Sequence, residues 1–414
     1  MKKRIVLLCN SCPFGGEAFL EIELRHVPEN CSVTLFPLMK RPDGRTIPAM
    51  AENVHVAVDG VKPSFADLLF AALHSPAAFV LHGEWRAAFG RKQFLRNAVK
   101  ALKFAFVSVS RARAVKRCLR KNADGEELVF YSYWMYETAY AAAWLKKQFP
   151  GSRFVSRCHG FDLYEHRHEN GYLPYRRFLM ERADWICPVG EDGRRYLEKL
   201  YGELWSAKIS VQRLGTEDFG VCQALKAEVP LVVSCSNLVD VKRVDRIIDA
   251  LAVCGRRIKW VHFGDGPLMG VIRARAQDLP ENIEWSFRGA VPNGEIMEFY
   301  STHAVDVFLN VSESEGVPVS IMEALSFGIP VIAADVGGTG EIVSDGENGR
   351  LLKAPFEQAA LIAALDEILD LDDVRRKALR ARARKIWQER CGAEVNFGRF
   401  YDRIAGYGED KVTG

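Results

Sequence analysis

Short β-rich runs that alternate with helical patterns constrain the fold of this chain more than any other feature of its sequence. Seven such runs occupy the first half, at residues 5–8, 33–35, 54–58, 128–131, 154–156, 185–187 and 209–211. Five more lie at residues 231–235, 258–263, 283–287, 307–309 and 331–333, and each precedes a helix-like segment. This rhythm predicts parallel sheets that are covered by helices.

A polar, irregular stretch at residues 215–230 separates the two sets of runs. Because 414 residues are more than one hydrophobic core usually organises, we expect an α/β protein with two doubly wound domains. The expected first domain spans residues 1–214, and the expected second domain spans residues 215–390.

The cysteines and the apolar runs indicate a reduced chain that does not cross a membrane. Ten cysteines are scattered, mostly within apolar runs, and neither paired CxxC units nor a nearby histidine spacing suggests zinc. They are typical of reduced core residues in a cytosolic protein. The longest apolar region, residues 65–81, is interrupted by Asp67, His74 and Pro76, so no transmembrane segment is predicted.

The segments that follow the second set of strands share a chemical character. Ligands of doubly wound sheets bind beyond the carboxyl ends of the strands. Four of these ends carry glycine, lysine or carboxylate, at residues 236–243, 264–267, 289–291 and 312–316. Glycine allows close approach of a ligand, and a helix that begins after Glu315 would direct free N–H groups at a phosphate. Glu315 and Glu323 can bond hydroxyls at two separated places, so the pattern indicates a nucleotide sugar.

The segment from Glu315 to Glu323 resembles the E-x7-E element of retaining glycosyltransferases with the GT-B fold. Its surroundings resemble family four of those enzymes, in Ser-Asn-Leu-Val-Asp-Val-Lys at 236–242, Gly-Asp-Gly-Pro at 264–267, Glu-Ala-Leu-Ser-Phe-Gly-Ile-Pro at 323–330 and Gly-Gly at 337–338. The resemblance covers nearly all of residues 230–355. It implies two Rossmann-like domains with a cleft between them, and a terminal helix at residues 391–414 that packs back on the first domain.

The resemblance also implies roles for charged residues of the second domain. Glu315 would contact the transferred sugar, Glu323 the ribose, and Lys242 the diphosphate, whose charge grows as the sugar departs. The family often has an arginine where Asn237 stands, so Arg243 would replace it only if its side chain turns inward.

Backbone groups complete the implied donor site. Val319 and Ser320 would offer N–H groups to the phosphates, and Ala290 and Val291 would face the base. Gly264 and Gly316 complete the expected donor-binding residues. The donor is expected to be a UDP- or GDP-sugar, and no cofactor or metal is expected, because the acidic ligand pair of metal-using sugar transferases is not evident.

Two segments of the first half resemble further parts of this family. Gly15 and Gly16 follow the first strand and resemble a glycine loop that faces donor phosphate and acceptor, although such a pair is more often only a turn. His159 follows the strand at 154–156 within a segment that resembles His-Gly-x-Asp. We expect His159 to bond the donor sugar and to organise the transition state, whereas Asp162 is alternatively a helix cap.

Twelve basic residues and no acidic residue lie in residues 86–121. Lys92, Arg96, Lys100 and Lys103 recur at helical spacing beside an apolar set formed by Leu95, Ala98, Val99, Leu102 and Phe106. This pattern predicts a basic amphipathic helix. We expect Arg91 and these four cations to bind an anionic membrane surface. The alternative is a core-packed helix with a solvated face, and nucleic acid is not expected because its binding motifs are absent.

The features together predict a cytoplasmic glycosyltransferase that is peripherally associated with the inner face of the membrane. It would transfer a sugar from a nucleotide donor to a lipid-linked saccharide in capsule, exopolysaccharide or O-antigen assembly. A nucleotide-sugar epimerase or a phosphorylase of the same fold is the first alternative. A non-enzymatic membrane scaffold is the alternative of another class, and it would have no reason to keep Lys242, Glu315 and Glu323 together.

Overall fold

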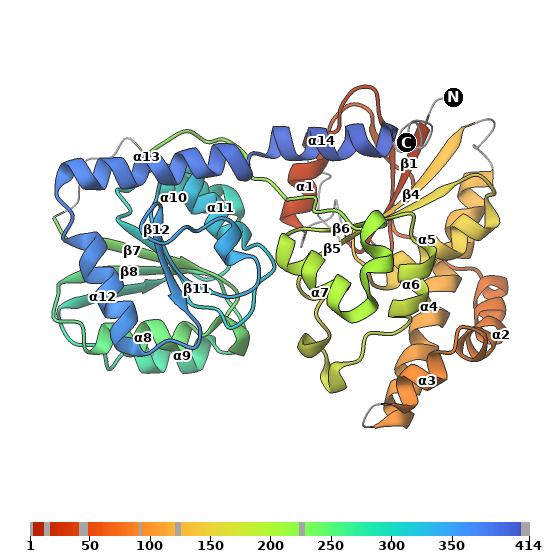
Figure 1. The fold of residues 1–414 in the computed structure, drawn as a ribbon, viewed down its shortest axis with the longest axis horizontal. Helices are drawn as coiled ribbons and strands as arrows, with labels where there is room; N and C mark the ends of the chain where they lie inside the picture. The colour runs from red at the N-terminus through yellow and green to blue at the C-terminus, as the bar shows by residue number, and fades with distance from the viewer. Residues whose placement is uncertain are drawn as a thin grey trace. The chain divides into compact units, whose positions relative to one another are not determined.

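The computed structural model divides into two compact units (Figure 1), of which residues 3–11, 17–40, 49–90, 93–120, 126–222 and 228–406 are described. The first unit comprises Met1–Arg213 together with Phe397–Gly414. The second unit comprises Leu214–Asn396. Each unit contains one six-stranded parallel sheet with helices packed against it, so the predicted α/β class with two doubly wound sheets is confirmed.

The sheet of the first unit has the strand order β3-β2-β1-β4-β5-β6. Its strands are β1 (Lys3–Cys9), β2 (Ser32–Pro37), β3 (Val54–Val56), β4 (Glu127–Ser132), β5 (Arg153–Cys158) and β6 (Trp185–Pro188). The helices are α1 (Ala18–Arg25), α2 (Phe65–Leu81), α3 (Glu84–Phe89), α4 (Phe94–Arg120), α5 (Glu137–Gln148), α6 (Arg176–Arg182) and α7 (Glu191–Tyr201).

Burial on both faces explains why these strands are continuous apolar runs. In β1, Val6 and Leu8 belong to one hydrophobic core, whereas Ile5 and Leu7 belong to the core on the opposite face. A strand covered on both sides has no polar face, so its sequence does not alternate.

The prediction of a seventh strand in the first unit is wrong. Residues 209–211 form only one isolated bridge, between Ile186 and Ile209. The neighbouring strand β6 has four residues and ends at Pro188, so there is little backbone for a further strand to pair with.

The second sheet has the order β12-β11-β10-β7-β8-β9. Its strands are β7 (Leu231–Cys235), β8 (Ile258–Phe263), β9 (Ile283–Phe287), β10 (Val307–Asn310), β11 (Val331–Asp335) and β12 (Gly349–Lys353). The helices are α8 (Val244–Ala252), α9 (Met269–Ala276), α10 (Asn293–Thr302), α11 (Val319–Ser326), α12 (Gln358–Leu369) and α13 (Asp373–Arg390). All five predicted strands are present. The sequence missed β12, whose short run begins with glycine and ends with lysine.

The two sheets share one topology. Counted from the start of each unit, both have the strand order 3-2-1-4-5-6, so the first and fourth strands are neighbours. The chain leaves these two neighbouring strands toward opposite faces of the sheet, and this opens a crevice at their carboxyl ends. Residues that follow β1 and β4, or β7 and β10, are therefore the ones placed to bind a ligand.

The last helix, α14 (Ala393–Gly406), returns the chain to the first unit from Phe397 onward. Phe400, Tyr401 and Ile404 are buried in the core that also contains Ile5 and Leu7. The hydroxyl of Tyr401 donates a hydrogen bond to Glu23 Oε1 at 3.1 Å, so a polar contact adds to the apolar packing.

Candidate functional site

The loops after β7 and β10 meet at the topological switch point of the second unit. The backbone N–H of Glu313 donates to the carbonyl of Val241 at 2.8 Å, which ties the two loops together. As a result, Lys242 Nζ lies 2.6 Å from Glu315 Oε1, and that oxygen also accepts from Asn310 Nδ2 at 3.3 Å. The Glu315 side chain is 8% exposed and that of Lys242 is 25% exposed. Two residues that the sequence singled out are thus brought into direct contact.

Glycines allow the surrounding loops to approach one another. Gly337 has a φ of +55°, and a Cβ there would lie 2.0 Å from the carbonyl oxygen of Glu315. Gly264 has a φ of +130°, and a Cβ there would lie 1.9 Å from the carbonyl oxygen of Ser236. Any larger residue would push the loops after β8 and β11 away from the Lys242 and Glu315 loops.

Glu323 lies on α11 and is buried. Its Oε1 accepts a hydrogen bond from Asn293 Nδ2, the first residue of α10, at 2.7 Å. Burial raises the pKa of Glu323 to about 7, and the bond from Asn293 only partly opposes this. The carboxyl is therefore close to half-ionised at neutral pH. The sequence did not identify Asn293, although its position just after the loop that follows β9 is a usable signal.

The first turn of α11 supplies backbone donors near these carboxylates. The N–H groups of Ile321 and Met322 bond the carbonyl of Pro318 at 3.2 and 3.3 Å. Val319 and Ser320 are the first two residues of the helix, where N–H groups have no acceptor within the helix. The positive end of the helix dipole adds to their attraction for an anion.

The other expected donor residues lie in the same loops. Asn237 is exposed after β7, Ala290 is exposed and Val291 is half-buried after β9, and Gly316 follows Glu315. The guanidinium of Arg243 bonds Asp245 at 2.9 Å and also bonds Glu313. Its charge is therefore compensated by two neighbouring carboxylates.

A buried histidine that the sequence analysis overlooked supports the Asn237 loop. Ser234 Oγ accepts from Trp260 Nε1 at 2.9 Å and lies 2.8 Å from His262 Nδ1, while His262 Nε2 lies 3.2 Å from the carbonyl of Ser236. Burial lowers the pKa of His262 to about 4, so the ring is neutral. It accepts from Ser234 and donates to Ser236, which fixes the start of the loop. In the sequence, a histidine within an otherwise apolar strand cannot be distinguished from an ordinary core residue.

In the first unit, His159 follows β5 and lies among aromatic rings. Its ring centroid is 5.7 Å from that of Phe19, 4.8 Å from Tyr133 and 4.4 Å from Trp134. Both ring nitrogens are buried and have no hydrogen-bond partner among the described residues. Nδ1 lies 3.8 Å from Asp162 Oδ2, which is within ion-pair distance but too long for a hydrogen bond.

Asp162 positions the backbone around His159. One carboxylate oxygen accepts from the N–H of His159 and the other accepts from the N–H of Met135, each at 2.6 Å. It therefore joins the loops after β4 and β5, and the alternative interpretation of Asp162 as a helix cap is wrong, because the next helical turn has Tyr164 as its N-cap.

Gly15 and Gly16 lie outside the described residues. Glu17 directly follows them and is buried, and its carboxylate accepts from Trp134 Nε1 at 2.5 Å and from the N–H of Ser11 at 2.9 Å. It therefore links the loops after β1 and β4 at the switch point of the first unit. Glu17 was not predicted as a site residue, although an acidic residue next to a glycine pair after a strand is a usable signal.

The basic helix α4 differs from the expected pattern. Arg91 and Lys92 lie outside the described residues. Arg96 forms an ion pair with Glu169, Lys100 Nζ donates to the carbonyl of Tyr172 at 2.7 Å, and Lys103 is exposed.

The buried face of α4 is not the apolar face that the sequence suggested. It contains Ala101, Phe104, Ala105 and Ser108, whereas Leu95 and Val99 are exposed on the same stretch of helix as the cations. The helix therefore packs in the core and also exposes apolar side chains. Its apolar residues occur on more than one face, and only one face is buried.

Neither a metal-binding cluster nor a membrane-spanning helix is present in the part of the chain that the structure describes. No group of three histidine, cysteine or acidic side chains is arranged to hold a metal ion there. No described helix is both long and apolar enough to cross a bilayer.

The fold defines the class of protein. Over 98% of this chain and 99% of the other, it matches the crystal structure of Anabaena HepE in complex with UDP and glucose, with a TM-score of 0.67 and 17% identity. Two Rossmann-like units with this similarity have the GT-B architecture, as the sequence analysis expected.

The family follows from the second unit. Residues 217–386 match the family described as Glycosyl transferases group 1, which confirms the resemblance found in the motifs. The match covers most of the second unit. A GDP-mannose-dependent alpha-(1-6)-phosphatidylinositol monomannoside mannosyltransferase of Mycobacterium tuberculosis is 26% identical over 232 residues, which are 50% of this chain and 60% of the relative. The putative colanic acid biosynthesis glycosyltransferase WcaL of Salmonella typhimurium is 27% identical over 239 residues, or 55% of this chain and 58% of the relative. The matches thus span about 60% of the length of these relatives.

Proposed function

We propose that this protein is a retaining glycosyltransferase that moves a sugar from a UDP- or GDP-sugar to a lipid-linked saccharide. The observation that carries the proposal is the contact of Lys242 with Glu315 at the switch point, with Glu323 on the adjoining helix. The names of the relatives support it, because they describe a GDP-mannose-dependent mannosyltransferase and a colanic acid glycosyltransferase. The polysaccharide would belong to a capsule, an exopolysaccharide or an O-antigen.

The site supplies the charges that such a transfer needs. When the sugar leaves, negative charge grows on the diphosphate, and a fixed cation stabilises it by about 3 kcal/mol or more. Lys242 and the first turn of α11 would provide this positive charge in place of a metal ion. Glu315 would accept hydrogen bonds from sugar hydroxyls, and Glu323 from the ribose hydroxyls.

His159 would contribute a hydrogen bond to a sugar hydroxyl. Its ring nitrogens are buried among aromatic side chains and have no hydrogen-bond partner among the described residues, although Nδ1 lies 3.8 Å from Asp162 Oδ2. A hydroxyl of the ligand would form a hydrogen bond with at least one of these nitrogens. A buried polar group without a hydrogen bond costs about 1–3 kcal/mol.

The acceptor is proposed to be reached at the cytoplasmic face of a membrane. Arg96 and Lys103 are exposed on α4, and Arg91 and Lys92 precede that helix in the sequence. Each basic residue near an anionic surface contributes about 1 kcal/mol to attachment. Lys100 is less suited to this role than the sequence suggested, because it is half-buried and bonds Tyr172.

The first experiment measures thermal stabilisation by a panel of nucleoside diphosphates and nucleotide sugars. We expect a selective shift for one nucleotide in the wild type, a reduced shift in Glu323→Ala, and an unchanged shift in Glu298→Ala, an exposed acid on α10. The absence of a shift in folded wild type would favour the scaffold alternative.

A second assay separates transfer from the other enzymes of this fold. The nucleotide sugar that stabilises the protein is incubated with membrane extract, with inorganic phosphate, or alone. Release of nucleotide with labelled lipid supports the proposal. Isomerisation of the donor without an acceptor would indicate an epimerase, and turnover that depends on phosphate would indicate a phosphorylase.

A further inference from the structure

Helix α2 exposes an apolar stripe. Phe65, Leu69 and Leu73 recur at intervals of four residues on one face and are 81%, 55% and 73% exposed, and Leu81 at the end of the helix is 80% exposed. The opposite side buries Asp67, Ala71, Ser75 and Ala78. A single exposed leucine is ordinary, but a continuous stripe along a helix indicates a surface that something else covers.

The stripe carries no acidic charge. Asp67 and His74 are the only ionisable side chains of α2, and Asp67 is buried. Arg113 Nε lies 3.1 Å from Asp67 Oδ1, and Arg117 bonds the other carboxylate oxygen. The surface that α2 presents is therefore both apolar and free of negative charge.

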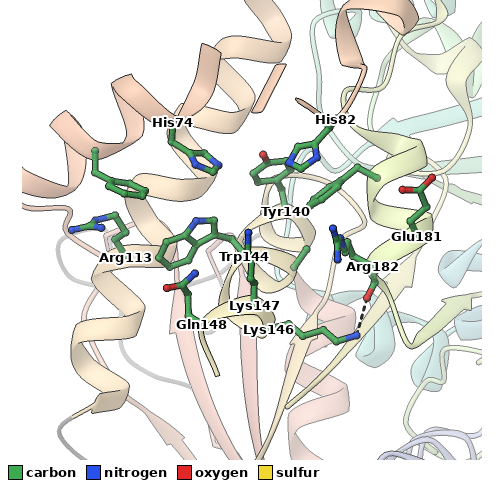
Figure 2. Close-up of a pocket in the computed structure, with 13 residues that line it drawn as sticks. His74, His82, Arg113, Tyr140, Trp144, Lys146, Lys147, Gln148, Glu181 and Arg182 are labelled. Carbon is green, nitrogen blue, oxygen red and sulfur yellow. Dashed lines mark hydrogen bonds between the residues drawn. The ribbon is translucent and has the colours of Figure 1, made fainter. Parts of the chain in front are cut away.

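A pocket of about 480 Å³ lies beside this helix and is lined by residues of α2, α4, α5 and α6 (Figure 2). Aromatic rings form much of its wall. Phe70 meets Trp144 edge to face at 6.2 Å, and Tyr140 lies 5.2 Å from Phe178. His82, just after α2, lies 4.1 Å from Phe178. The pocket thus has a rigid aromatic frame, distinct from the strand ends where the donor residues lie.

Positive charge gathers around the pocket. Lys146 is paired with Asp184 at 2.7 Å, and the one acidic side chain of the lining, Glu181, is paired with Arg177 at 3.1 Å. Lys147 and Arg182 have no carboxylate partner within the described ranges. Figure 2 shows these cationic side chains on α5 and α6, opposite the histidines. The pocket therefore carries uncompensated positive charge.

The two histidines show that this charge converges on the pocket. The pKa of His74 is lowered by burial and then by Lys147. The pKa of His82 is lowered by burial and then chiefly by Arg182. Both rings are thus uncharged at neutral pH and can accept or donate a hydrogen bond without adding charge.

Tyr140 offers an unused donor at the same place. It is 1% exposed, it lines the pocket, and its hydroxyl has no hydrogen-bond partner among the described residues. A buried hydroxyl without a partner is costly, and a phosphate oxygen in a cationic pocket is an acceptor that would satisfy it.

We propose that this pocket binds the phosphate of a membrane lipid whose acyl chains lie along the exposed stripe of α2. Lys147 and Arg182 neutralise the phosphate, Tyr140 donates a hydrogen bond to it, and Phe65, Leu69 and Leu73 contact the hydrocarbon. This lipid site goes beyond the proposed sugar transfer and does not depend on it.

A phosphate-bearing lipid accounts for both features, whereas other occupants account for only one. A soluble phosphate would compensate Lys147 and Arg182 but would leave the α2 stripe in water. A second copy of the chain would cover the stripe but would bring no anion to the pocket. The combination of an aromatic, cationic pocket with an adjoining apolar helix matches an amphiphile.

The test uses the full-length protein and flotation with two kinds of vesicle. One kind is phosphatidylcholine alone, and the other is an equal mixture of phosphatidylcholine and phosphatidylglycerol. We expect Lys147→Glu/Arg182→Glu to weaken binding to the anionic vesicles at least about tenfold, because two surface cations are reversed. The matched control Arg195→Glu/Lys199→Glu, on α7, should bind within about twofold of wild type.

A second pair of variants tests the stripe. Leu69→Ser/Leu73→Ser should weaken binding to both kinds of vesicle by about tenfold or more, because the buried apolar area is lost. Leu200→Ser/Leu204→Ser removes two other exposed leucines of the first unit and should have no effect. Equal binding by the two leucine pairs would overturn the role of α2. If the wild type is a dimer and Leu69→Ser/Leu73→Ser is a monomer, the stripe contacts a second copy of the chain instead.

Tyr140→Phe keeps the ring and removes only the hydroxyl. We expect unchanged or slightly higher thermal stability and about threefold to tenfold weaker binding to the anionic vesicles. Wild-type affinity in this variant would exclude the hydroxyl from the site. Stabilisation by inorganic phosphate without vesicle binding would overturn the lipid in favour of a soluble phosphate.

The outcome can be separated from that of the proposed transfer. Nucleotide stabilisation reports the second unit, so its retention shows that the proposed donor site is intact. Because the pocket and stripe variants lie in the first unit, their circular dichroism spectra and unfolding midpoints must match those of the wild type to show that this unit is folded. If Arg96→Glu/Lys103→Glu abolishes vesicle binding while the pocket and stripe pairs behave as their controls, attachment occurs through α4 alone and the lipid site is wrong.

Discussion

Two acid–base pairs, one in each unit, show how burial decides what an ion pair does. In the first unit, Arg157 Nη2 lies 3.2 Å from Glu23 Oε2, and both side chains are completely buried. In the second unit, Lys242 Nζ lies 2.6 Å from Glu315 Oε1, and the lysine is one quarter exposed. The first pair stabilises the packing of its unit, and the second lies at the proposed donor site.

The Arg157 pair is closed off by further hydrogen bonds. Arg157 Nε donates to the hydroxyl of Tyr131 at 2.9 Å, and its Nη1 donates to the carbonyl of Gln212 at 2.8 Å. Glu23 Oε1 accepts from Tyr131 at 3.0 Å and from Tyr401 at 3.1 Å. The network joins α1, β4 and β5 to α14, so it holds the last helix on the first unit.

The Lys242 pair is open by comparison. Among the described residues, Lys242 Nζ donates one hydrogen bond, to Glu315, which leaves donors for a diphosphate oxygen. Glu315 likewise keeps acceptor sites for hydroxyls. A charge pair that is partly hydrated can exchange partners at low cost, whereas a sealed pair cannot.

The largest expected effect is on stability, from Arg157→Met. The substitution leaves Glu23 buried without its cation, so we expect the free energy of unfolding of the first unit to fall by about 3–5 kcal/mol. Urea denaturation followed by circular dichroism measures it. Lys242→Met should cost less by the same measurement, about 1–3 kcal/mol, because Glu315 keeps the hydrogen bond from Asn310 and lies beside a partly exposed position. Equal losses would mean that the two pairs do not differ as described.

The next effect is on catalysis, from Lys242→Met. Loss of the cation opposite the departing diphosphate should lower kcat/KM by about 100-fold to 1,000-fold. A transfer assay with the donor found by thermal shift measures it. Lys385→Met, an exposed lysine on α13, is the matched control and should retain wild-type activity. A loss of less than threefold in Lys242→Met would remove Lys242 from the reaction.

Glu323→Gln is expected to stabilise the protein at alkaline pH. The folded-state pKa of about 7 lies above the ordinary value of 4.5, so the folded chain holds a proton that the unfolded chain releases. Stability therefore falls as pH rises from about 4.5 to 7 and stays lowered above that. At pH 8 the variant should be more stable by roughly 1–3 kcal/mol, and the difference should vanish below about pH 4.5. A constant difference at all pH values would contradict this assignment.

The smallest expected effect is the pH dependence of nucleotide affinity. In the proposed site the ionised carboxylate of Glu323 would accept hydrogen bonds from the ribose hydroxyls, so nucleotide affinity should rise by about threefold to tenfold from pH 6 to pH 8 in the wild type. Calorimetry at several pH values measures it. Glu323→Gln should show only the change that comes from the titration of the nucleotide's own phosphate. Parallel curves for the two proteins would place the ribose elsewhere.

The pattern of apolar runs was sufficient to predict two parallel sheets, because strands buried on both faces have no polar alternation. Two predictions of strands were wrong, and both concern the edges of the sheets. Residues 209–211 are apolar enough for a strand but meet the short strand β6, and β12 is a strand despite its glycine and charged ends. Edge strands depend on a neighbour, which a local pattern cannot supply.

The sequence predicted the placement of polar residues better in the second unit than in the first. Lys242 and Glu315 follow strands within a recognisable motif, so the topology brings them together, and Glu323 lies on the helix that follows. Glu17 and Asn293 were missed, since each is an ordinary polar residue whose partner, Trp134 or Glu323, is distant in sequence.

The sequence by itself determined the class of fold, the family that the second unit resembles and the strand ends that carry its charged residues, since these depend on local periodicity and on motifs at strand ends. Only the tertiary structure decided which charges are sealed and which are open. It showed that Arg157 is a structural residue, that Arg243 is compensated by neighbouring acids, and that α2 is uncovered. The burial of a side chain and its ion pairs depend on contacts with residues that are far apart in the sequence, and these contacts form only when the chain folds.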